Sequence, residues 1–348
     1  MASTRDRFER RLLRTALGLP PRVQRLLAGA PVVREGQTLS TETQLMLRLE
    51  SIGGVPPVET LPWAEGRVEL DRQGAMVGGR QPIGSIRDLE VPGAEGPLPA
   101  RLYTPTTRLA DDAAPTMLFL HGGGMTYGGL RSHDAAARHL AENSGVQLLA
   151  VEYRLAPEHP FPACVDDAAA AYAWLVGHAA EVGADAQRLA VGGDSAGGYL
   201  AATTAIRAAE QELPLRFQLL VYPCTDFVEA SASRRSFGEG FFLTNEFIDR
   251  CTDAFFPPAT DREAPLASIG RRESFPDGLA PAYVVTAGFD PLRDEGEAYG
   301  HLLAEHGVEV ELRRYPSMIH GFFNVVGVGR EPAAYNREIA ARLAAGLA

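Results

Sequence analysis

The segment Gly193-Asp194-Ser195-Ala196-Gly197-Gly198 places a serine on a turn that is flanked by glycines. Residues 188–191, before it, are largely apolar and typical of a strand, and residues 199–209, after it, are alanine-rich and typical of a helix. A serine at a tight strand-to-helix turn matches the G-x-S-x-G nucleophile elbow, whose glycines let a strained backbone pack closely. Because a serine hydroxyl is a weak nucleophile near neutral pH, Ser195 needs a base and a carboxylate that orients the base.

The base is predicted to be His320, one of eight histidines in the chain. It follows an expected strand at 308–315, and a loop at that position lies at the same edge of a parallel sheet as Ser195. Four other histidines fall in or at the ends of helices that we expect at the surface, which favours a solvated side chain: His139, His178, His301 and His306.

The orienting carboxylate is predicted to be Asp290, in the loop after an expected strand at 282–286. Asp294 and Glu295 compete with it, but both fall in the first turn of the next helix, where acidic side chains favour the helix dipole. A nucleophile, acid and base in the chain order serine, aspartate, histidine is typical of α/β hydrolases and differs from the order in other serine triads.

Negative charge develops on the oxygen of a carbonyl that a serine attacks, and fixed backbone N–H groups stabilise it. The segment His121-Gly122-Gly123-Gly124 follows an apolar run at 116–121, and its glycines would let N–H groups approach a substrate. The HGGG pattern is an oxyanion-hole element of lipases and esterases. The N–H of Ala196, directly after the nucleophile, is expected to be a further donor.

Two other interpretations of this glycine loop are weaker. A phosphate-binding loop would need Gly-Lys-Ser/Thr, and the chain contains no lysine: all 33 basic residues are arginine. A metal site formed by His121, Glu158 and His159 is conceivable, but their spacing matches no common ligand motif. We therefore predict neither a metal nor an organic cofactor.

Alternating strands and helices must bring these residues together. The first two strands suggest a hairpin, and the later alternation predicts an α/β fold with a doubly wound parallel sheet. Strands are expected at 86–91, 100–103, 116–121, 146–153, 188–192, 216–222, 282–286 and 308–315. Helices are expected between them at 134–143, 165–177, 196–210 and 293–306, and a final helix at 332–346.

Two regions lie outside this alternation. At the N-terminus, helices are expected within 3–29, split by Pro20-Pro21, and at 40–51, followed by a glycine- and proline-rich linker at 55–80. Residues 226–270 are rich in aromatic side chains and are expected to form an insertion above the sheet. N-terminal caps are expected from polar residues: Thr41 with Gln44, Thr244 or Asn245, and Asp166 with Asp167.

Composition narrows the classes of partner and compartment. The net charge of −11 argues against nucleic acid, which requires a basic surface. Three widely spaced cysteines, Cys164, Cys224 and Cys251, suggest buried free thiols. The first 29 residues lack the apolar core of a signal peptide, and no window reaches the ~18 apolar residues of a membrane span, so a cytoplasmic protein without stable membrane insertion is expected. The arginine-rich helix near the N-terminus could lie on a membrane, but packing on its own protein is favoured.

Taken together, the motifs resemble the hormone-sensitive-lipase-like (bacterial family IV) carboxylesterases of the α/β-hydrolase superfamily. The resemblance spans residues 84–325 in family order. Position 125 is Met where relatives often have an aromatic residue, which suggests a softer pocket wall. The matching segments are His121–Gly124, Tyr153–Pro162, Gly193–Gly197, Asp290–Gly296 and His320–Phe322.

The resemblance implies an eight-stranded, mostly parallel sheet flanked by helices, with a helical cap. The cap would comprise residues 1–75 and 226–265, and the core would comprise 76–225 and 266–348. The implied site has Ser195 as nucleophile, Asp290 as acid and His320 as base, with oxyanion donors from Gly122, Gly123 and Ala196. Arg154 and Glu158, within the matching segment at 153–162, are expected to brace the loop beneath the site.

The predicted activity is hydrolysis of short- to medium-chain acyl esters through an acyl-enzyme. An amidase or deacetylase using the same triad, and a non-catalytic ligand-binding descendant of the fold, are the alternatives. Assays with matched ester and amide substrates distinguish an esterase from an amidase. Covalent labelling of Ser195 distinguishes an enzyme from a non-catalytic binding protein. Relatives often dimerise through the strand at 308–315, so a homodimer is expected, which a monomeric mass in solution would contradict.

Overall fold

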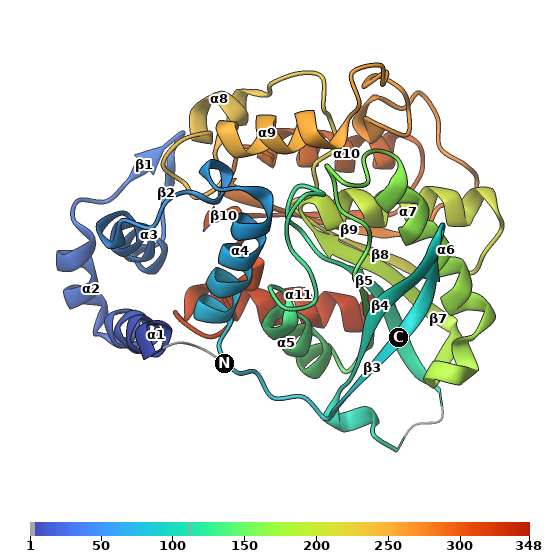
Figure 1. The fold of residues 1–348 in the computed structure, drawn as a ribbon, viewed down its shortest axis with the longest axis horizontal. Coiled ribbons are helices and arrows are strands. Elements are labelled where there is room, and N and C mark those ends of the chain that lie inside the picture. The colour runs from blue at the N-terminus through green and yellow to red at the C-terminus, as the bar shows by residue number, and fades with distance from the viewer. Residues whose placement is uncertain (1–3, 111–112) are drawn as a thin grey trace.

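The computed structural model describes residues 4–110 and 113–348, and its core is an eight-stranded, mostly parallel sheet (Figure 1). The strand order is β10-β9-β8-β7-β5-β6-β4-β3; β3 and β4 pair antiparallel, β4 pairs antiparallel with β6, and the remaining neighbours are parallel. The predicted α/β fold is confirmed. The strands are β3 (Ser85–Gly93), β4 (Gly96–Thr104), β5 (Ala114–Leu120), β6 (Gln147–Val151), β7 (Ala184–Asp194), β8 (Phe217–Val221), β9 (Ala282–Phe289) and β10 (Val310–Ile319).

Helices cover both faces of this sheet, as the unbroken apolar runs of its central strands require. Every residue of β5, β6, β8 and β9 is buried. Alternate residues of β5 serve opposite faces: Leu118 packs in the cluster with α6, α7 and α10, whereas Phe119 packs in the cluster with α5 and α11. These helices are α5 (Asp134–Ser144), α6 (Ala163–Gly177), α7 (Ala196–Glu210), α10 (Arg293–Glu305) and α11 (Glu331–Gly346).

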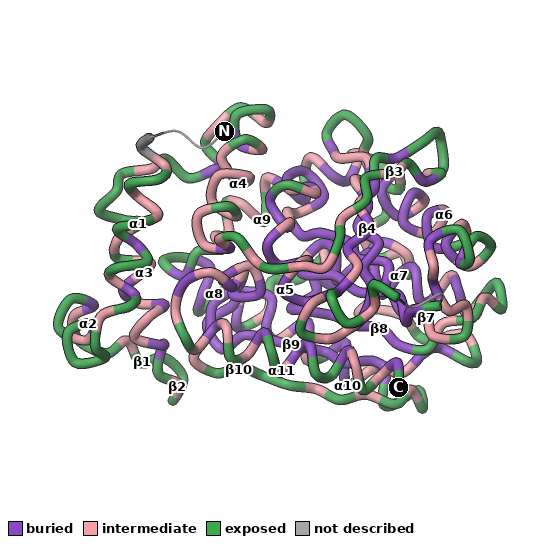
Figure 2. The backbone as a smooth tube through the Cα atoms, turned by 90° about the horizontal axis from the view of Figure 1, so that it is seen from below, coloured by how far each residue is buried: buried purple, intermediate pink, exposed green. Residues whose placement is uncertain are grey.

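The N-terminal elements are more exposed than the sheet (Figure 2). Leu39, in this part of the chain, packs in one cluster with Phe289 of β9 and Ile319 of β10. The short hairpin of β1 and β2 is joined to β10 by a hydrogen bond from the Ser40 N–H to the Ser317 carbonyl, 3.0 Å long. Within the described ranges, no helix combines the length and apolar character needed to cross a membrane. The elements are α1 (Thr4–Gly18), α2 (Pro21–Ala28), β1 (Val33–Arg34), β2 (Gln37–Thr38), α3 (Thr41–Gly53) and α4 (Trp63–Gly78).

Helix α4 occupies most of the expected linker at 55–80, so that prediction was wrong. The glycines that suggested a linker are instead positions where the helix touches other backbone and rings. A Cβ on Gly74 would lie 2.2 Å from the Ser132 carbonyl oxygen, and one on Gly66 would lie 2.7 Å from the Tyr127 ring. Close packing of a helix against its neighbours, rather than flexibility, therefore explains these glycines.

An insertion with two short helices connects β8 to β9 and lies above the sheet, as expected (Figure 1). The helices are α8 (Ala232–Phe237) and α9 (Asn245–Phe255). The predicted cap of α9 is confirmed at Thr244, whose hydroxyl accepts a hydrogen bond of 3.0 Å from the Phe247 N–H. Aromatic side chains fasten the insertion to the core: Phe237 and Phe241 both pack edge-on or tilted against Phe289 at the end of β9.

The expected caps at Asp166 and Asp167 were wrong because α6 begins earlier, at Ala163. Asp167 is fully buried and accepts two hydrogen bonds from the Arg154 guanidinium, at 2.8 and 2.9 Å. Asp166 pairs with Arg207 on α7. This ion pair joins the segment at 153–162 to α6, which agrees with the expectation that Arg154 braces the loop beneath the site.

Two further predictions, the capping box of Thr41 with Gln44 and a solvated His139, were wrong because tertiary contacts fix these side chains elsewhere. Gln44 does not complete a capping box with Thr41; its amide donates to the carbonyls of Ala28 and Ala30 and so joins α3 to α2. His139 is buried rather than solvated, and burial lowers its pKa to about 4. The three cysteines are free and buried, as predicted.

Candidate active site

Ser195 lies at the turn between β7 and α7 with φ 56° and ψ −120°, a backbone conformation that non-glycine residues rarely adopt. Close contact with the end of β5 makes glycine necessary on both sides of the turn. A Cβ on Gly193 would lie 2.2 Å from the Leu120 carbonyl oxygen, and one on Gly197 would lie 1.9 Å from the same atom. The turn therefore projects the serine at the carboxyl edge of the sheet, as a nucleophile elbow does.

The structure brings together the three residues that the sequence placed in a triad. The Ser195 Oγ lies 2.9 Å from His320 Nε2, and His320 Nδ1 lies 2.8 Å from Asp290 Oδ2. Asp290 is fully buried, and its other oxygen accepts a 2.8 Å hydrogen bond from the Leu292 N–H. With Nδ1–H donating to the carboxylate, Nε2 is the free acceptor for the serine proton, which is the tautomer that a general base requires.

Tyr222 packs against the imidazole and limits its rotation. The ring centroids of Tyr222 and His320 are 4.3 Å apart. His320 is itself almost fully buried, and Gly321, in the left-handed conformation at φ 81°, turns the chain directly after it. The imidazole is thus held by packing as well as by its two hydrogen bonds.

In the glycine loop after β5, one backbone N–H is hydrogen-bonded and two others have no acceptor among the described residues. The Gly122 N–H donates to the Asp194 carboxylate, with a nitrogen-to-oxygen distance of 3.1 Å. In the described part of the chain, the amides of Gly123, Gly124 and Ala196 have no hydrogen-bond acceptor. The expectation that Gly122 supplies an oxyanion donor therefore needs correction, because its N–H is already used to hold the loop.

Asp194 was not singled out by the sequence analysis, although it precedes the nucleophile. Its buried carboxylate receives hydrogen bonds from Gly122 N and, at 3.3 Å, from Asn324 Nδ2, and it lies 3.3 Å from His133 Nε2. Burial opposes its ionisation, but His133 and then His320 outweigh this effect, so the pKa of its carboxyl is lowered. Asp194 thus fastens the glycine loop and the segment after His320 to the elbow.

His121 supports the same loop as a neutral side chain. Burial, together with the neighbouring His133, lowers its pKa to about 3. Its ring stacks on Tyr153 at a centroid distance of 4.1 Å, and the Tyr153 hydroxyl donates to the His121 carbonyl at 2.6 Å. The alternative metal site is not assembled, because Glu158 instead pairs with Arg67 of α4.

Parts of α4 and α9 meet above the glycine loop. The Tyr127 ring, at the end of the loop, lies 5.2 Å from the Trp63 ring and 5.3 Å from the Phe247 ring. The Arg250 guanidinium lies 4.1 Å from the centre of the Trp63 ring. A Cβ on Gly124 would lie 2.6 Å from the Cys251 sulfur, so the loop and α9 are in direct contact.

Comparison with known proteins agrees with this geometry. The alpha/beta hydrolase fold family matches residues 117–324. Carboxylic ester hydrolase LipN of Mycobacterium tuberculosis is 40% identical over 94% of this chain and 89% of its own length. Ethyl acetate hydrolase of Pseudomonas putida is 37% identical over 84% of this chain and 93% of its own. An ester hydrolase from the metagenome of Lake Arreo has a TM-score of 0.84 and 39% identity, covering 88% of this chain and 98% of that structure.

Proposed function

This chain belongs to the alpha/beta hydrolase fold family and is a carboxylic ester hydrolase, and we propose that Ser195, His320 and Asp290 form its catalytic triad. The observation that carries the proposal is the continuous hydrogen-bonded series from Ser195 Oγ through His320 to Asp290, with distances of 2.9 and 2.8 Å. These three side chains come from loops at one edge of the sheet, which is where ligands bind in α/β folds.

In the proposed mechanism, His320 Nε2 accepts the Ser195 proton as Oγ attacks the ester carbonyl carbon. The imidazolium then gives this proton to the departing alkoxide, and the alcohol leaves an acyl group on Oγ. His320 next removes a proton from water, which attacks the acyl carbon. As the bond from the acyl carbon to Oγ breaks, the imidazolium returns this proton to Ser195 Oγ and the carboxylic acid leaves. Asp290 holds the imidazole and stabilises its charged form throughout.

We propose that the oxyanion donors are the N–H groups of Gly123, Gly124 and Ala196. They are the amides beside the nucleophile that the described part of the chain leaves without an acceptor. Gly123 and Gly124 have φ values of 121° and 62°, a region that favours glycine, so a side chain at either position would strain the loop. Asp194 fixes this loop through Gly122 rather than through the donors themselves.

The substrates proposed are esters with short to medium acyl chains. Phe242 supports an apolar pocket: it is 43% exposed, and its ring lies 2.9 Å from the position that a Cβ on Gly321 would take, directly after the base. Its φ of 77° is rare for an aromatic residue, so the fold holds it outward at some cost. The name of the Pseudomonas putida relative, ethyl acetate hydrolase, also suggests a small acyl group.

We further propose that residues 1–75 and 226–265 form a cap over a core made of 76–225 and 266–348. The contacts of Tyr127 with Trp63 and Phe247 support this division. Because α4 continues to Gly78, the first boundary is better placed after residue 78. A homodimer through β10, which forms an edge of the sheet, and a cytoplasmic location remain predictions from the sequence.

The experiment that tests the mechanism is hydrolysis of p-nitrophenyl butyrate by the parent and by Ser195→Ala. We expect kcat to fall by about 10⁴-fold or more, because the hydroxyl is the attacking group. The thermal unfolding midpoint should stay near the parental value, which shows that the variant is folded. A Ser195→Ala variant as active as the parent would rule out the proposed nucleophile.

A further inference from the structure

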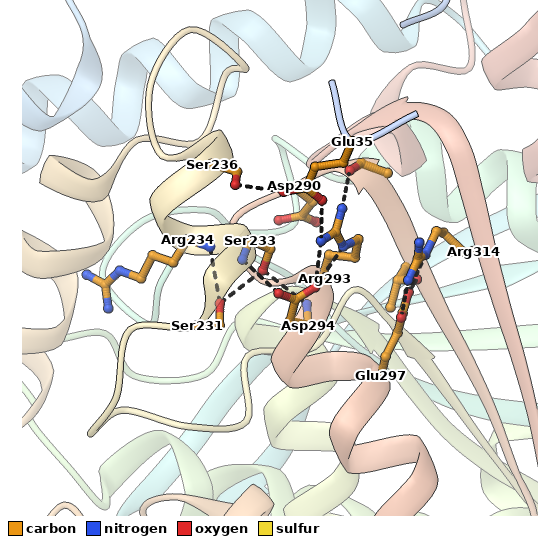
Figure 3. A network of polar contacts seen from close by, with 12 residues as sticks. Glu35, Ser231, Ser233, Arg234, Ser236, Asp290, Arg293, Asp294, Glu297 and Arg314 are labelled. Atoms are coloured by element: carbon orange, nitrogen blue, oxygen red, sulfur yellow. Dashed lines mark hydrogen bonds and ion pairs between the residues drawn. The ribbon is translucent and has the colours of Figure 1, made fainter. Parts of the chain in front are cut away.

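The loop that carries Asp290 is closed by the side chain of Arg293, which is nearly buried at the start of α10 (Figure 3). Its guanidinium donates to the Gly288 carbonyl at 3.2 Å, to Asp294 Oδ1 at 2.8 Å and to Glu35 Oε2 at 2.8 Å. A cation with 6% of its side chain exposed requires such partners, since an unpaired buried charge is costly.

These contacts lie on both sides of the acid. Gly288 precedes Asp290 and Arg293 follows it, and the Arg293 N–H also donates to the Asp290 carbonyl at 3.2 Å. The arginine therefore links the two ends of a short loop. A shift of this loop would move Asp290 relative to His320, because the acid contacts the imidazole through a single oxygen.

Glu35 reaches Arg293 from an unusual turn. It occupies the turn between β1 and β2 with φ 49°, followed by Gly36 at φ 75°. Two consecutive positive φ values favour Asn, Asp or Gly at the first position, so glutamate there carries backbone strain. Its carboxylate binds Arg293 and also accepts a 2.7 Å hydrogen bond from the Ser236 hydroxyl in α8. The contacts made by the side chain explain why a strained glutamate is held at this turn.

Helix α8 holds the same loop from another direction (Figure 3). The Ser233 N–H donates to Asp294 Oδ2 at 2.7 Å, and the Ser233 hydroxyl donates to the Pro291 carbonyl at 2.8 Å. The loop is therefore fastened to a hairpin near the N-terminus and to the insertion after β8, two segments that lie far apart in the sequence.

We propose that Glu35 and Arg293 are positioning residues for the catalytic acid: their ion pair fixes the loop of Asp290 against the N-terminal hairpin and α8. This inference rests on the proposed function, in which Asp290 orients His320. The hydrogen bond from Ser236, opposed by burial and reinforced by Arg293, lowers the pKa of the Glu35 carboxyl, so the bridge is charged at neutral pH. The N-terminal segment thereby contributes to the alignment of the triad without touching the substrate.

Glu35→Asn and Glu35→Gln test different parts of the proposal: the first removes the reach of the side chain, and the second removes only its charge. Asparagine suits the turn better than glutamate but is one methylene shorter, so the first variant relaxes the backbone while it removes the bridge. We expect its kcat for p-nitrophenyl butyrate to fall by about tenfold, with KM within about twofold, because a small misplacement of the acid impairs chemistry more than binding. Glutamine keeps the length of the side chain and loses only the charge, so we expect a loss of about threefold.

Arg314→Gln is the matched control. Arg314 pairs with Glu297, on the same helix as Arg293, through Nε at 2.6 Å, and this pair does not touch the acid loop (Figure 3). We expect its kcat to remain within about twofold of the parent, because this ion pair is half-exposed on the arginine side and lies away from the acid loop. A tenfold loss in this control would show that any ion pair of α10 affects kcat and would overturn the specific role of Glu35.

Asp290→Asn separates the inference from the proposed function. An inactive Asp290→Asn beside Glu35 variants that keep the parental kcat would overturn the positioning role and leave the triad intact. A fully active Asp290→Asn would overturn the triad itself. If Glu35→Asn does not fold, the kcat of Glu35→Gln decides: a loss supports the proposal and a parental value contradicts it. A melting temperature of Glu35→Asn at or above the parental one, together with a lower kcat, excludes a merely structural role.

Discussion

The carboxylates of Asp194 and Glu35 each hold a loop of the candidate site, but their surroundings differ. Asp194 is 3% exposed and receives its donors inside the core, next to the nucleophile. The Glu35 side chain is 40% exposed and reaches the acid loop from a hairpin outside the sheet. Arg293 is nearly buried, but it keeps Asp294 as a partner when Glu35 is replaced. Because a network buried on all sides costs more to break than a pair with one exposed partner, substitutions beside the nucleophile should reduce activity more than substitutions of Glu35.

Among the variants that test this comparison, Gly197→Ala should have the largest effect, since it deforms the turn that carries the nucleophile. The new Cβ would lie 1.9 Å from the Leu120 carbonyl oxygen, so the elbow must deform. We expect hydrolysis of p-nitrophenyl butyrate to fall by more than about 10²-fold, as misplacement of a nucleophile by about 1 Å does. Gly177→Ala, at the end of α6 with open space around its Cβ, should keep parental activity. Equal activity in both variants would contradict the close packing of the elbow.

Asp194→Asn should have the next largest effect. It keeps the shape of the side chain but removes the charge that faces His133, so we expect a loss of about 3 kcal/mol in the free energy of unfolding at pH 7. We also expect kcat to fall by about 10²-fold, because the Gly122 N–H then donates to an uncharged acceptor and the loop that carries the proposed oxyanion donors is held less firmly. Urea unfolding and steady-state kinetics measure the two effects. A variant with parental stability and kcat would show that Asp194 is dispensable.

The same variant should change the response to acid. Because the folded pKa of Asp194 is lowered, its stabilising contribution is complete above the ordinary aspartate value of about 4 and is lost as the pH falls through the folded value. The difference in unfolding free energy between parent and Asp194→Asn should therefore be largest at pH 7 and shrink below about pH 4. A difference that grows with acidity would contradict the direction of the shift.

The Glu35 variants should have smaller effects: kcat should fall by about tenfold in Glu35→Asn and by about threefold in Glu35→Gln. These losses measure how strongly activity depends on the support of the acid loop. If Glu35→Asn lowered kcat as strongly as Asp194→Asn, the contrast between the two carboxylates would fail.

Phe242→Ala should have the smallest effect on catalysis and should alter selectivity. Phe242 lies beside Gly321, so its removal should widen the proposed acyl pocket next to the base. We expect the ratio of kcat/KM for p-nitrophenyl octanoate to that for p-nitrophenyl acetate to change by about fivefold to tenfold. Val228→Ala, another exposed apolar residue of the same insertion, should leave this ratio unchanged. An unchanged ratio in Phe242→Ala would contradict the proposal that Phe242 lines the acyl pocket.

The sequence predicted the eight strands of the sheet and the three residues of the proposed triad because both depend on short-range signals. Apolar runs mark the buried central strands, and Ser195, Asp290 and His320 each lie within a few residues of the end of an expected strand. Local pattern was misleading at α4, where glycines that pack closely look like glycines of a linker.

Short-range sequence signals could not predict the roles of Asp194 and Glu35, because their partners are distant in the sequence. Asp194 finds partners 72 residues before it and 130 residues after it, and Glu35 finds Arg293 across almost the whole chain. The sequence could not show which glycine of the loop has a free N–H, because the direction of an N–H depends on the fold and not on the residue type. Gly122 was therefore assigned to the oxyanion hole although its N–H is used by Asp194. An acidic residue directly before the nucleophile, and a glutamate where a turn favours asparagine, are the signals that could have pointed to the two supports.

Peptide mapping after reaction with a fluorophosphonate probe tests the central claim most directly. We expect one phosphonylated peptide, containing Ser195, with no labelling of Ser195→Ala. Labelling of Asp290→Asn should be strongly slowed, because the hydroxyl reacts readily only when His320 is oriented to take its proton. An adduct on another residue, or equal labelling of the parent and Ser195→Ala, would contradict the assignment of Ser195 as the nucleophile.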